Sequence, residues 1–544
     1  MRRLWSSRPA GRVATVDPVV DQRAVGVAQR AAEVAAAAGV DLGDDLALWR
    51  LAGGRPAARR SVPGQPEELG ALLEASFSAP ARQEAGAHYT PAPLAAGLVE
   101  RALDGRATPK VGDPACGGGA LLLAAARYLA ARGEDPVEVV GRLWGMDVDP
   151  VAVATTEVAL TLWAGAPPPP GRLVVRDALG ELPSWPPLDV VVGNPPFLSQ
   201  LDGVTARGPE AAARLRYRFG DAVRAYTDAA SLFLLVACEL AAEDGRVALV
   251  QPQSVLAARD GAGVRAAVSE RGRVAEVWIP PLPGFAASVD VCVPVIDLGV
   301  PESLDTWSAP LARANGVPPV DLPRHRALAD VATTTAAFRS EYYGMVDHVH
   351  EHAVLPTGTP LVTTGLVDLG GCAWGDRPAR IGGRSWDQPV LDVAALDGRA
   401  ADWVRRTGGP KLVVATQTRV VEVVVDEEGD WVAAVPLVVV LAPVEDLWRL
   451  AAALAAPPVT AWLLERVAGT ALTPQSLKVT AALLREVPLP RDGRAWDDGA
   501  AAFREGDLHA FATVMSAAYG TSAGVAAWWS ERATTVWSPR GARR

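Results

Sequence analysis

The chain has 544 residues, of which 49% are hydrophobic and 21% are charged, and its formal net charge is −10. The apolar content is enough to bury a large core, which excludes wholesale disorder, and the length predicts roughly three domains of ordinary size. No apolar run approaches the ~18 residues of a membrane helix, and no hydrophobic stretch follows the N-terminal charges, so we expect neither a membrane protein nor a secretory signal.

The four cysteines lie far apart and form no CxxC pair: Cys116, Cys238, Cys292 and Cys372. This spacing argues against a disulfide framework or a zinc ribbon and favours the reducing cytoplasm. The acidic net charge does not exclude a nucleic-acid partner, because what matters is a local basic face. Residues 198–227 carry five Arg against three acids, and residues 375–420 carry eight basic residues against five acids. Each stretch fits either a phosphate-facing surface or ordinary solvated surface.

The chain order predicts four regions. Residues 1–80 are Ala-rich and helical, whereas residues 81–300 alternate short β-branched runs with helical stretches, as βαβ units do. The expected strands are 111–113, 143–147, 173–177, 188–193, 246–251, 274–279 and 289–298, and the expected helices are 120–131, 150–164, 228–242 and 255–270. The fold class is therefore α/β, with a mostly parallel, doubly wound sheet.

Beyond residue 300 the sequence is rich in Trp and Pro. Residues 301–500 contain β-type runs at 411–425 and 431–441 and a helical stretch at 444–469, which predicts a mixed α/β domain. Residues 501–544 are predicted to form an amphipathic helical tail.

A glycine-rich turn follows the first expected strand, in Asp113-Pro114-Ala115-Cys116-Gly117-Gly118-Gly119. Such a turn lets backbone approach a ligand closely, and the helix after it offers unpaired N–H groups. The next two strands end in Asp147 and Asp177, at the same carboxyl edge where doubly wound sheets bind ligands. Asp147 is placed to accept both hydroxyls of a ribose, and Asp177 lies near an adenine amino group. Because no GxxxxGK[ST] cradle is present, the nucleoside ligand is expected to lack phosphates.

The fourth strand runs into Asn194-Pro195-Pro196-Phe197. Neither proline has an N–H, so the segment presents acceptors: the Asn194 amide oxygen and the Pro195 carbonyl. Such an array suits the exocyclic amino group of a planar base, with Phe197 as a stacking plate.

Together these segments resemble the N6-adenine DNA methyltransferases that use S-adenosylmethionine, of the NPP[FY] type found in restriction-modification systems. A Rossmann-like core of seven strands is expected of that family. Upstream, Gly86-Ala87-His88-Tyr89-Thr90-Pro91 looks like the family's Tyr-Thr-Pro segment, and the C-terminal region looks like its target-recognition half. One departure is Gly118, where the family more often has Ser; it should loosen the turn without abolishing binding.

The resemblance implies a role for each matching residue. Tyr89, Thr90 and Pro91 would contact the methionine part of S-adenosylmethionine. The rest of the pocket would be formed by Asp113, Ala115, Cys116, Gly117, Asp147, Asp177 and Asn194. Asn194 and Pro195 would accept the N6 hydrogens of adenine, with Pro196 fixing the backbone and Phe197 stacking on the base. The base must be flipped out of double-stranded DNA.

The expected protein is therefore a cytoplasmic, nucleoid-associated modification enzyme of a restriction-modification or phage-defence system, with a separate restriction or specificity subunit as partner. The alternatives are a protein-glutamine or ribosomal-RNA amino-group methyltransferase, and a catalytically silent DNA-binding subunit. The three Lys lack the acid two residues upstream that a PD-(D/E)xK nuclease needs, so no nuclease is predicted.

Two further clusters have weaker signals. His348, His350 and His352 alternate as metal ligands do but have no Cys nearby, so a solvated linker is favoured and no metal is expected. Trp374, Trp386 and Trp403 lie in the second basic stretch, where they serve either as core residues or as DNA contacts.

Overall fold

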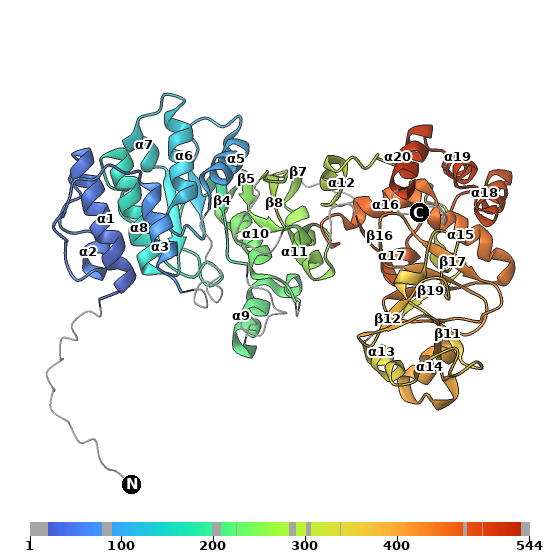
Figure 1. The fold of residues 1–544 in the computed structure, drawn as a ribbon. Coiled ribbons are helices and arrows are strands. Elements are labelled where there is room, and N and C mark those ends of the chain that lie inside the picture. The colour runs from blue at the N-terminus through green and yellow to red at the C-terminus, as the bar shows by residue number, and fades with distance from the viewer. Residues whose placement is uncertain are drawn as a thin grey trace, which may run out of the picture. The chain divides into compact units, whose positions relative to one another are not determined.

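The computed structural model describes residues 20–78, 90–197, 208–224, 226–281, 290–300, 306–337, 339–471, 476–491 and 493–534. The chain forms two compact units (Figure 1). Unit 1 comprises Met1–Pro252 and Asp260–Leu304, and unit 2 comprises Gln253–Arg259 and Asp305–Arg544.

Unit 1 contains the predicted α/β sheet, in the order β3-β2-β1-β4-β5-β8-β6 with β7 also paired to β8. The strands are β1 (Val111–Asp113), β2 (Leu143–Asp147), β3 (Leu173–Val175), β4 (Leu188–Gly193), β5 (Ala241–Leu249), β6 (Gln251–Pro252), β7 (Gly272–Trp278) and β8 (Val291–Leu298). Strands β1 to β5 are parallel, and β8 is antiparallel to β5, β6 and β7. The prediction of a Rossmann-like core is confirmed, and the two-residue β6 is added to the seven expected strands.

The described α-helices of unit 1 cover this sheet, and the N-terminal ones extend unit 1 beyond it (Figure 1). They are α1 (Gln22–Ala38), α2 (Ala47–Leu51), α3 (Glu67–Ala75), α5 (Ala92–Leu103), α6 (Ala120–Ala130), α7 (Pro136–Val140), α8 (Pro150–Ala164), α9 (Pro209–Phe219), α10 (Ala229–Leu240) and α11 (Ala262–Ser269). The helix expected at 255–270 is shorter than predicted, because its first residues form 3₁₀ turns at Gln253–Leu256 and Arg259–Gly261.

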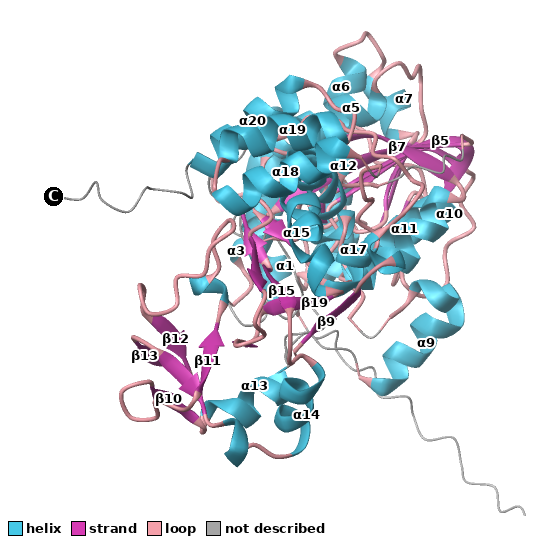
Figure 2. Cartoon of the chain, turned by 90° about the vertical axis from the view of Figure 1, so that its right-hand side faces the viewer, coloured by secondary structure: helices cyan, strands magenta, loops and turns pink. Residues whose placement is uncertain are grey.

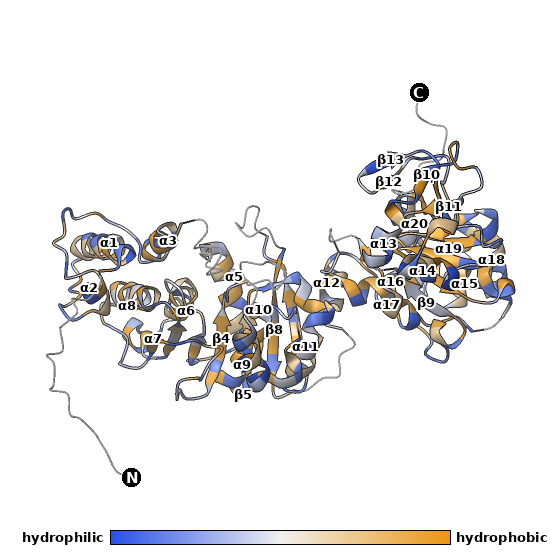
Figure 3. Ribbon diagram, turned by 90° about the horizontal axis from the view of Figure 1, so that it is seen from below, coloured by the Kyte–Doolittle hydropathy of each residue, from blue (hydrophilic) through white to orange (hydrophobic). Residues whose placement is uncertain are grey.

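Helix α8 shows how local sequence sets the bounds of these elements. The Asp149 carboxylate accepts the N–H of Val151, Pro150 occupies the first turn, and Gly165 ends the helix in a left-handed conformation (φ 75°). Its apolar residues occur on every face, and the helix is buried nearly all round (Figure 3). It is therefore held from two sides: the sheet packs on one, and the N-terminal helices α1, α2 and α3 pack on the other.

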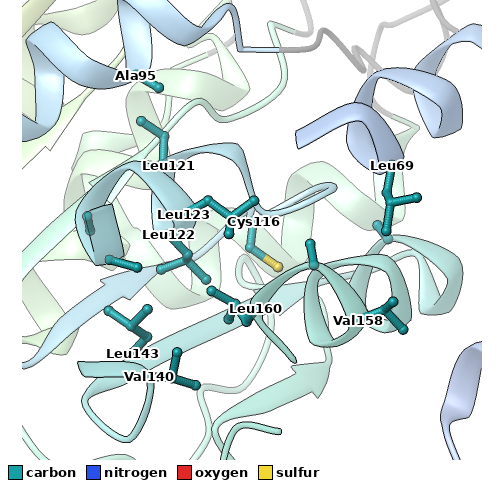
Figure 4. Close-up of a cluster of buried hydrophobic side chains, with 14 of the residues drawn as sticks. Leu69, Ala95, Cys116, Leu121, Leu122, Leu123, Val140, Leu143, Val158 and Leu160 are labelled. Atoms are coloured by element: carbon teal, nitrogen blue, oxygen red, sulfur yellow. The ribbon is translucent and has the colours of Figure 1, made fainter. Parts of the chain in front are cut away.

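The N-terminal helices share one hydrophobic core with the sheet. Leu69 of α3 lies beside α8, in the same cluster as Leu122 of α6 and Val158 of α8 (Figure 4). All three side chains are fully buried, and burying such a side chain contributes about 1.5–3 kcal/mol. Helices α1 to α3 are thus an integral layer of unit 1.

Unit 2 is mixed α/β, as expected. Its two larger sheets have the orders β17-β15-β19-β9 and β10-β14-β11-β18 (Figure 2). The strands are β9 (Thr333–Ala336), β10 (Val349–Glu351), β11 (Thr359–Val362), β12 (Ala379–Ile381), β13 (Arg384–Trp386), β14 (Pro389–Leu391), β15 (Lys411–Ala415), β16 (Gln417–Thr418), β17 (Val423–Asp426), β18 (Val432–Ala433), β19 (Leu437–Leu441) and β20 (Leu477–Lys478). The helices are α12 (Ala309–Ala314), α13 (Arg339–Val346), α14 (Gly398–Arg406), α15 (Leu447–Ala455), α16 (Pro457–Val467), α17 (Ala481–Arg485), α18 (Arg494–Glu505), α19 (Leu508–Ala518) and α20 (Ala523–Thr534).

Three long elements predicted in unit 2 are divided in the structure. The β run at 411–425 splits into β15, β16 and β17, because β16 pairs with β20 and β17 turns back antiparallel to β15. The run at 431–441 splits into β18 and β19, which belong to different sheets. The helix at 444–469 breaks into α15 and α16 at Pro457, since proline starts a helix readily but interrupts one.

Among the described residues, no single helix has the length and apolarity needed to cross a membrane; only the bent pair Val444–Ala455 and Pro457–Val467 passes that test, on length and composition, when taken together.

The tryptophans of the second basic stretch all contact the hydrophobic core of unit 2. Trp403 is fully buried and donates its indole N–H to the carbonyl of Ala433 at 2.9 Å. Trp374 and Trp386 pack against the same hydrophobic cluster and donate to backbone carbonyls too. The DNA-contact interpretation is therefore wrong for the fully buried Trp403, and it stays a prediction for the half-buried Trp374 and Trp386.

A buried ion pair joins β15 to β17. Lys411 Nζ lies 2.7 Å from Asp426 Oδ2, and the two side chains are 0% and 3% exposed. Asp426 also accepts the N–H groups of Gly429, Asp430 and Trp431, which closes the turn after β17. Each charge is thus compensated within the protein.

Because breaking a buried pair leaves an uncompensated charge, Asp426→Asn should lower the free energy of unfolding of unit 2 by about 3–5 kcal/mol. Asp402→Ala breaks the exposed pair with Arg405 and should change it by less than about 1 kcal/mol. Urea unfolding followed by circular dichroism measures both. Equal effects of the two substitutions would contradict the importance of the buried pair.

Candidate active site

A cavity of about 510 Å³ lies at the carboxyl edge of the sheet in unit 1. It sits where β1 pairs with both β2 and β4, which is the point where the strand order reverses and where doubly wound sheets bind ligands. Its size is in the range of small-molecule sites. Its lining includes Thr90, which precedes α5, and predicted site residues from all four strand ends: Asp113, Ala115, Cys116, Gly117, Asp147, Asp177, Asn194 and Pro196.

The glycine turn forms the floor of this cavity. Gly117 and Gly119 have φ angles of 51° and 86°, a left-handed conformation that favours glycine. The turn is anchored to its surroundings, because Cys116 donates its N–H to Met146 on β2 and Thr156 of α8 donates its hydroxyl to the Gly117 carbonyl at 2.7 Å. Gly119 caps α6 without a side-chain acceptor, so the first N–H groups of α6 are left for a ligand.

Two carboxylates lie at the cavity, Asp113 buried and Asp147 half-buried. Asp113 is 1% exposed, and burial together with repulsion by Asp147 raises its pKa to about 7, although it accepts the N–H of Ala115. Burial raises the pKa of Asp147 as well, although Asp147 accepts the N–H groups of Gly117 and Asp149 at 3.0 and 2.9 Å. Backbone N–H groups donate hydrogen bonds to both carboxylates, so the cavity favours a ligand that brings positive charge or several donors.

Asp177 has a different environment. Its side chain is exposed at the rim, where it accepts the N–H of Leu179 at 2.9 Å. Of the three acids at the strand ends, Asp113 is buried, Asp147 is half-buried and Asp177 is exposed at the rim of the cavity.

Asn194 is oriented by Thr90. The Asn194 side chain donates from Nδ2 to Thr90 Oγ1 at 3.1 Å, which leaves the amide oxygen Oδ1 to accept. Thr90 is buried and precedes α5, so this contact joins two segments 104 residues apart that the sequence associates with cofactor and substrate. The acceptor expected of Asn194 is thus held at the wall of the cavity.

The other predicted residues are less directly placed. Pro195 is buried, and Phe197 is half-buried and packs against the hydrophobic core. Pro91 caps the start of α5, and Tyr89 lies outside the described residues. Cys116 lines the cavity, but burial raises the pKa of its thiol well above the usual range, so it remains a thiol and is unsuited to act as a nucleophile.

Some lining residues carry no signal in the sequence. Gly70, Leu73, Glu74 and Phe77 come from the N-terminal layer, at or after α3, and Ala229 and Phe233 come from α10. Only Asp149, in Asp147-Val148-Asp149-Pro150, has a recognisable local pattern, as a helix N-cap. The remainder reach the cavity through tertiary packing.

Outside the cavity, the His348–His352 segment includes β10. Within the part of the chain that the structure describes, no group of three or more His, Cys, Asp and Glu side chains is arranged to hold a metal ion.

Comparison with known proteins identifies this unit. Residues 69–301 match the family model described as N-6 DNA Methylase. The matched residues are similar to that family and make up less than half of the chain. The match begins within α3 and extends past β8, so it includes the cavity and all four strand ends. No curated protein matches the chain at a significant level.

Several solved structures resemble this chain. The type IIL restriction-modification enzyme MmeI, solved in complex with DNA, is 12% identical, with a TM-score of 0.53 over 90% of this chain and 83% of that chain. A modification subunit of a putative type I restriction enzyme from Vibrio vulnificus YJ016 is 19% identical over 47% of this chain and 53% of that one, with a TM-score of 0.34. A type I methyltransferase subunit from Streptococcus thermophilus is 23% identical over 43% and 50%, with a TM-score of 0.32. The chain spans about half the length of these two subunits.

Gly118 of the glycine turn is required by a close approach of α3. A Cβ atom added at Gly118 would lie 2.4 Å from the Cα of Gly70, and one added at Gly70 would lie 3.2 Å from the Gly118 carbonyl oxygen. The backbones of α3 and of the glycine turn are thus in contact at Gly118, where the family more often has Ser. This contact is a physical reason for glycine at this position.

Gly118→Ser should therefore displace α3 and lower the free energy of unfolding by about 1–3 kcal/mol, the usual cost of overpacking. Gly26→Ser on α1 is the matched control, because a Cβ there meets no atom within 4 Å. Thermal unfolding of the two variants measures the difference. A Gly118→Ser protein as stable as the Gly26→Ser protein would contradict the close packing.

Proposed function

We propose that this protein is a site-specific DNA methyltransferase that transfers a methyl group from S-adenosylmethionine to N6 of adenine, as the modification component of a restriction-modification or phage-defence system. The observation that carries this proposal is the Asn194 acceptor, oriented by Thr90 at the wall of an acidic cavity inside the N-6 DNA methylase match. The fold similarity to a restriction-modification enzyme in complex with DNA supports it.

The cavity residues fit S-adenosylmethionine. Its ammonium and sulfonium groups carry the positive charge that Asp113 and Asp147 favour, and its ribose hydroxyls supply donors for Asp147. Asp177 would bind the adenine amino group at the rim, and the glycine turn and Thr90 would bind the methionine part. When bound, the cofactor supplies an electrophilic methyl group.

The protein's contribution to catalysis is to position the acceptor nitrogen. Asn194 Oδ1 and the Pro195 carbonyl accept the two N6 hydrogens, which draws the N6 lone pair out of conjugation and aims it at the methyl group. Phe197, anchored against the core, contacts the flipped base. No covalent nucleophile is needed, consistent with the protonated Cys116 thiol.

Double-stranded DNA is the proposed substrate. Helix α9 follows the Asn194–Phe197 segment in the chain and exposes Arg214, Arg216 and Tyr217, the last at 95%. Arg218 anchors α9 beside the cavity, since it donates to the Ala178 carbonyl at 2.7 Å and pairs with Glu239. We assign phosphate contacts to the two exposed arginines and base readout to unit 2. Cytoplasmic location and a separate restriction or specificity subunit complete the proposal.

Asn194→Ala removes an acceptor whose interaction strengthens in the transition state, so kcat for methyl transfer to DNA should fall about 10²–10³-fold with little change in cofactor affinity. Asn315→Ala, at the chain's other asparagine on the C-terminal side of α12, is the matched control. Mass spectrometry of the DNA product should show N6-methyladenine for the wild type and the control. Methylated cytosine or methylated protein, or full turnover by Asn194→Ala, would contradict the proposal.

Cofactor binding should depend on pH through Asp113. Its pKa of about 7 means that the carboxyl is mostly protonated at pH 6 and mostly ionised at pH 8. A cationic ligand prefers the ionised form, so affinity should increase as pH rises, by about tenfold between pH 6 and pH 8. Calorimetric titration with S-adenosylmethionine, whose sulfonium carries the positive charge, measures this change. The increase should be absent in Asp113→Asn, and affinity that falls with rising pH in the wild type would refute the assignment.

A further inference from the structure

The N-terminal layer takes part in the cavity itself. Helix α3 lies against the glycine turn through the contact of Gly70 with Gly118, and Leu73, Glu74 and Phe77 add side chains to the cavity lining. Leu69 on the same helix is fully buried in the core shared with α8, so α3 is fixed relative to the turn (Figure 4).

Phe77, two residues after the end of α3, is the aromatic side chain of this wall. It is half-buried, and the Arg23 guanidinium carbon lies 4.9 Å from the centre of its ring. A cation held over a ring at this distance stabilises the ring position by about 0.5–1 kcal/mol at exposed sites. One face of Phe77 is thus taken by Arg23, while the residue also borders the cavity.

Arg23 is itself fixed by two carboxylates. It donates to Asp149 at 2.6 and 3.2 Å and pairs with Asp21 at 2.7 Å, in a partly buried cluster. Asp149 lines the cavity, caps α8 and donates its own N–H to Asp147 Oδ1. The contacts therefore run from Phe77 through Arg23 and Asp149 to Asp147, the proposed ribose-binding carboxylate.

We propose that Phe77 is a cofactor-contacting residue that packs on the nucleoside half of the ligand, and that Arg23 is a positioning residue that holds Phe77 and Asp149 for this contact. This inference rests on the proposed function. It gives the N-terminal helical layer a direct part in cofactor binding, because Phe77 and the Arg23 side chain that holds it both lie within residues 20–78. An aromatic ring suits this position, since it offers a large rigid apolar face to a ribose or a purine.

The test measures affinity for S-adenosylhomocysteine and, by competition, for 5′-methylthioadenosine, which lacks the amino-acid part. Phe77→Ala should weaken both ligands by the same factor, about tenfold, the value of 1.4 kcal/mol of lost contact. The KM for S-adenosylmethionine should rise by that factor, while kcat at saturating cofactor stays within about twofold, a pattern that general destabilisation would not give.

Arg23 and a matched ion pair on the same helix separate positioning from stability. Arg23→Ala should weaken S-adenosylhomocysteine binding, and Arg23→Lys should restore part of it through the pair with Asp149. Arg30→Ala breaks the α1–α3 pair between Arg30 and Glu68 and should leave the affinity unchanged. If Phe77→Ala does not fold, Phe77→Leu keeps apolar packing without the aromatic face and takes its place.

Each outcome decides a separate point. Loss of less than twofold in the folded Phe77 variant, with normal binding by the wild type, overturns the inference and leaves the proposed function intact. Weaker S-adenosylhomocysteine binding with unchanged 5′-methylthioadenosine binding overturns the nucleoside assignment. Failure of the wild type to bind either ligand overturns the proposed function itself.

Discussion

Two carboxylates at the cavity organise the site. Asp113 is buried and Asp147 is half-buried at the carboxyl edge of the sheet, where backbone N–H groups donate hydrogen bonds to both. Burial raises the pKa of both, which means that ionisation of these groups opposes folding in the absence of a ligand. The Lys411–Asp426 pair in unit 2 shows the opposite arrangement, since each charge there has its partner at 2.7 Å. A cationic ligand would therefore compensate the negative charge of Asp113 and Asp147 in the cavity.

The geometry around the carboxylates follows from backbone packing. Gly117 and Gly119 allow the turn, and the Gly70–Gly118 contact brings α3 onto it, so the floor and one wall of the cavity are both made by close approach of main chain. The N-terminal helices are therefore part of the site's support. Thr90 then links this pocket to the acceptor Asn194.

Sequence alone predicted those parts of the fold whose signal is local. The bounds of β1, β2, β4 and α8 agree with the runs at 111–113, 143–147, 188–193 and 150–164, because buried parallel strands and a capped helix leave strong local patterns. Strand ends at one sheet edge follow from the fold class, which is why Asp113, Asp147 and Asn194 were correctly expected near one another.

The rest depends on contacts that no local pattern encodes. Nothing in the sequence around Phe77 indicates that it reaches a cavity formed by residues 113–194, since its place is set by Arg23 and Asp149, which are 126 residues apart. In unit 2, the predicted β runs are divided because their parts pair with different strands. Strand β16, for example, pairs with β20. Trp403 looked available for DNA because it is flanked by basic residues, yet its indole fills the core of the unit.

The central claim is that this acidic cavity holds the methyl donor with its reactive end at Asn194. A crystal structure of the full chain with S-adenosylhomocysteine tests it most directly. The account predicts the ribose hydroxyls on Asp147, the adenine towards Asp177, and the sulfur facing the Asn194 side of the cavity. A ligand bound elsewhere, or one whose sulfur is turned away from Asn194 towards the sheet, would contradict it.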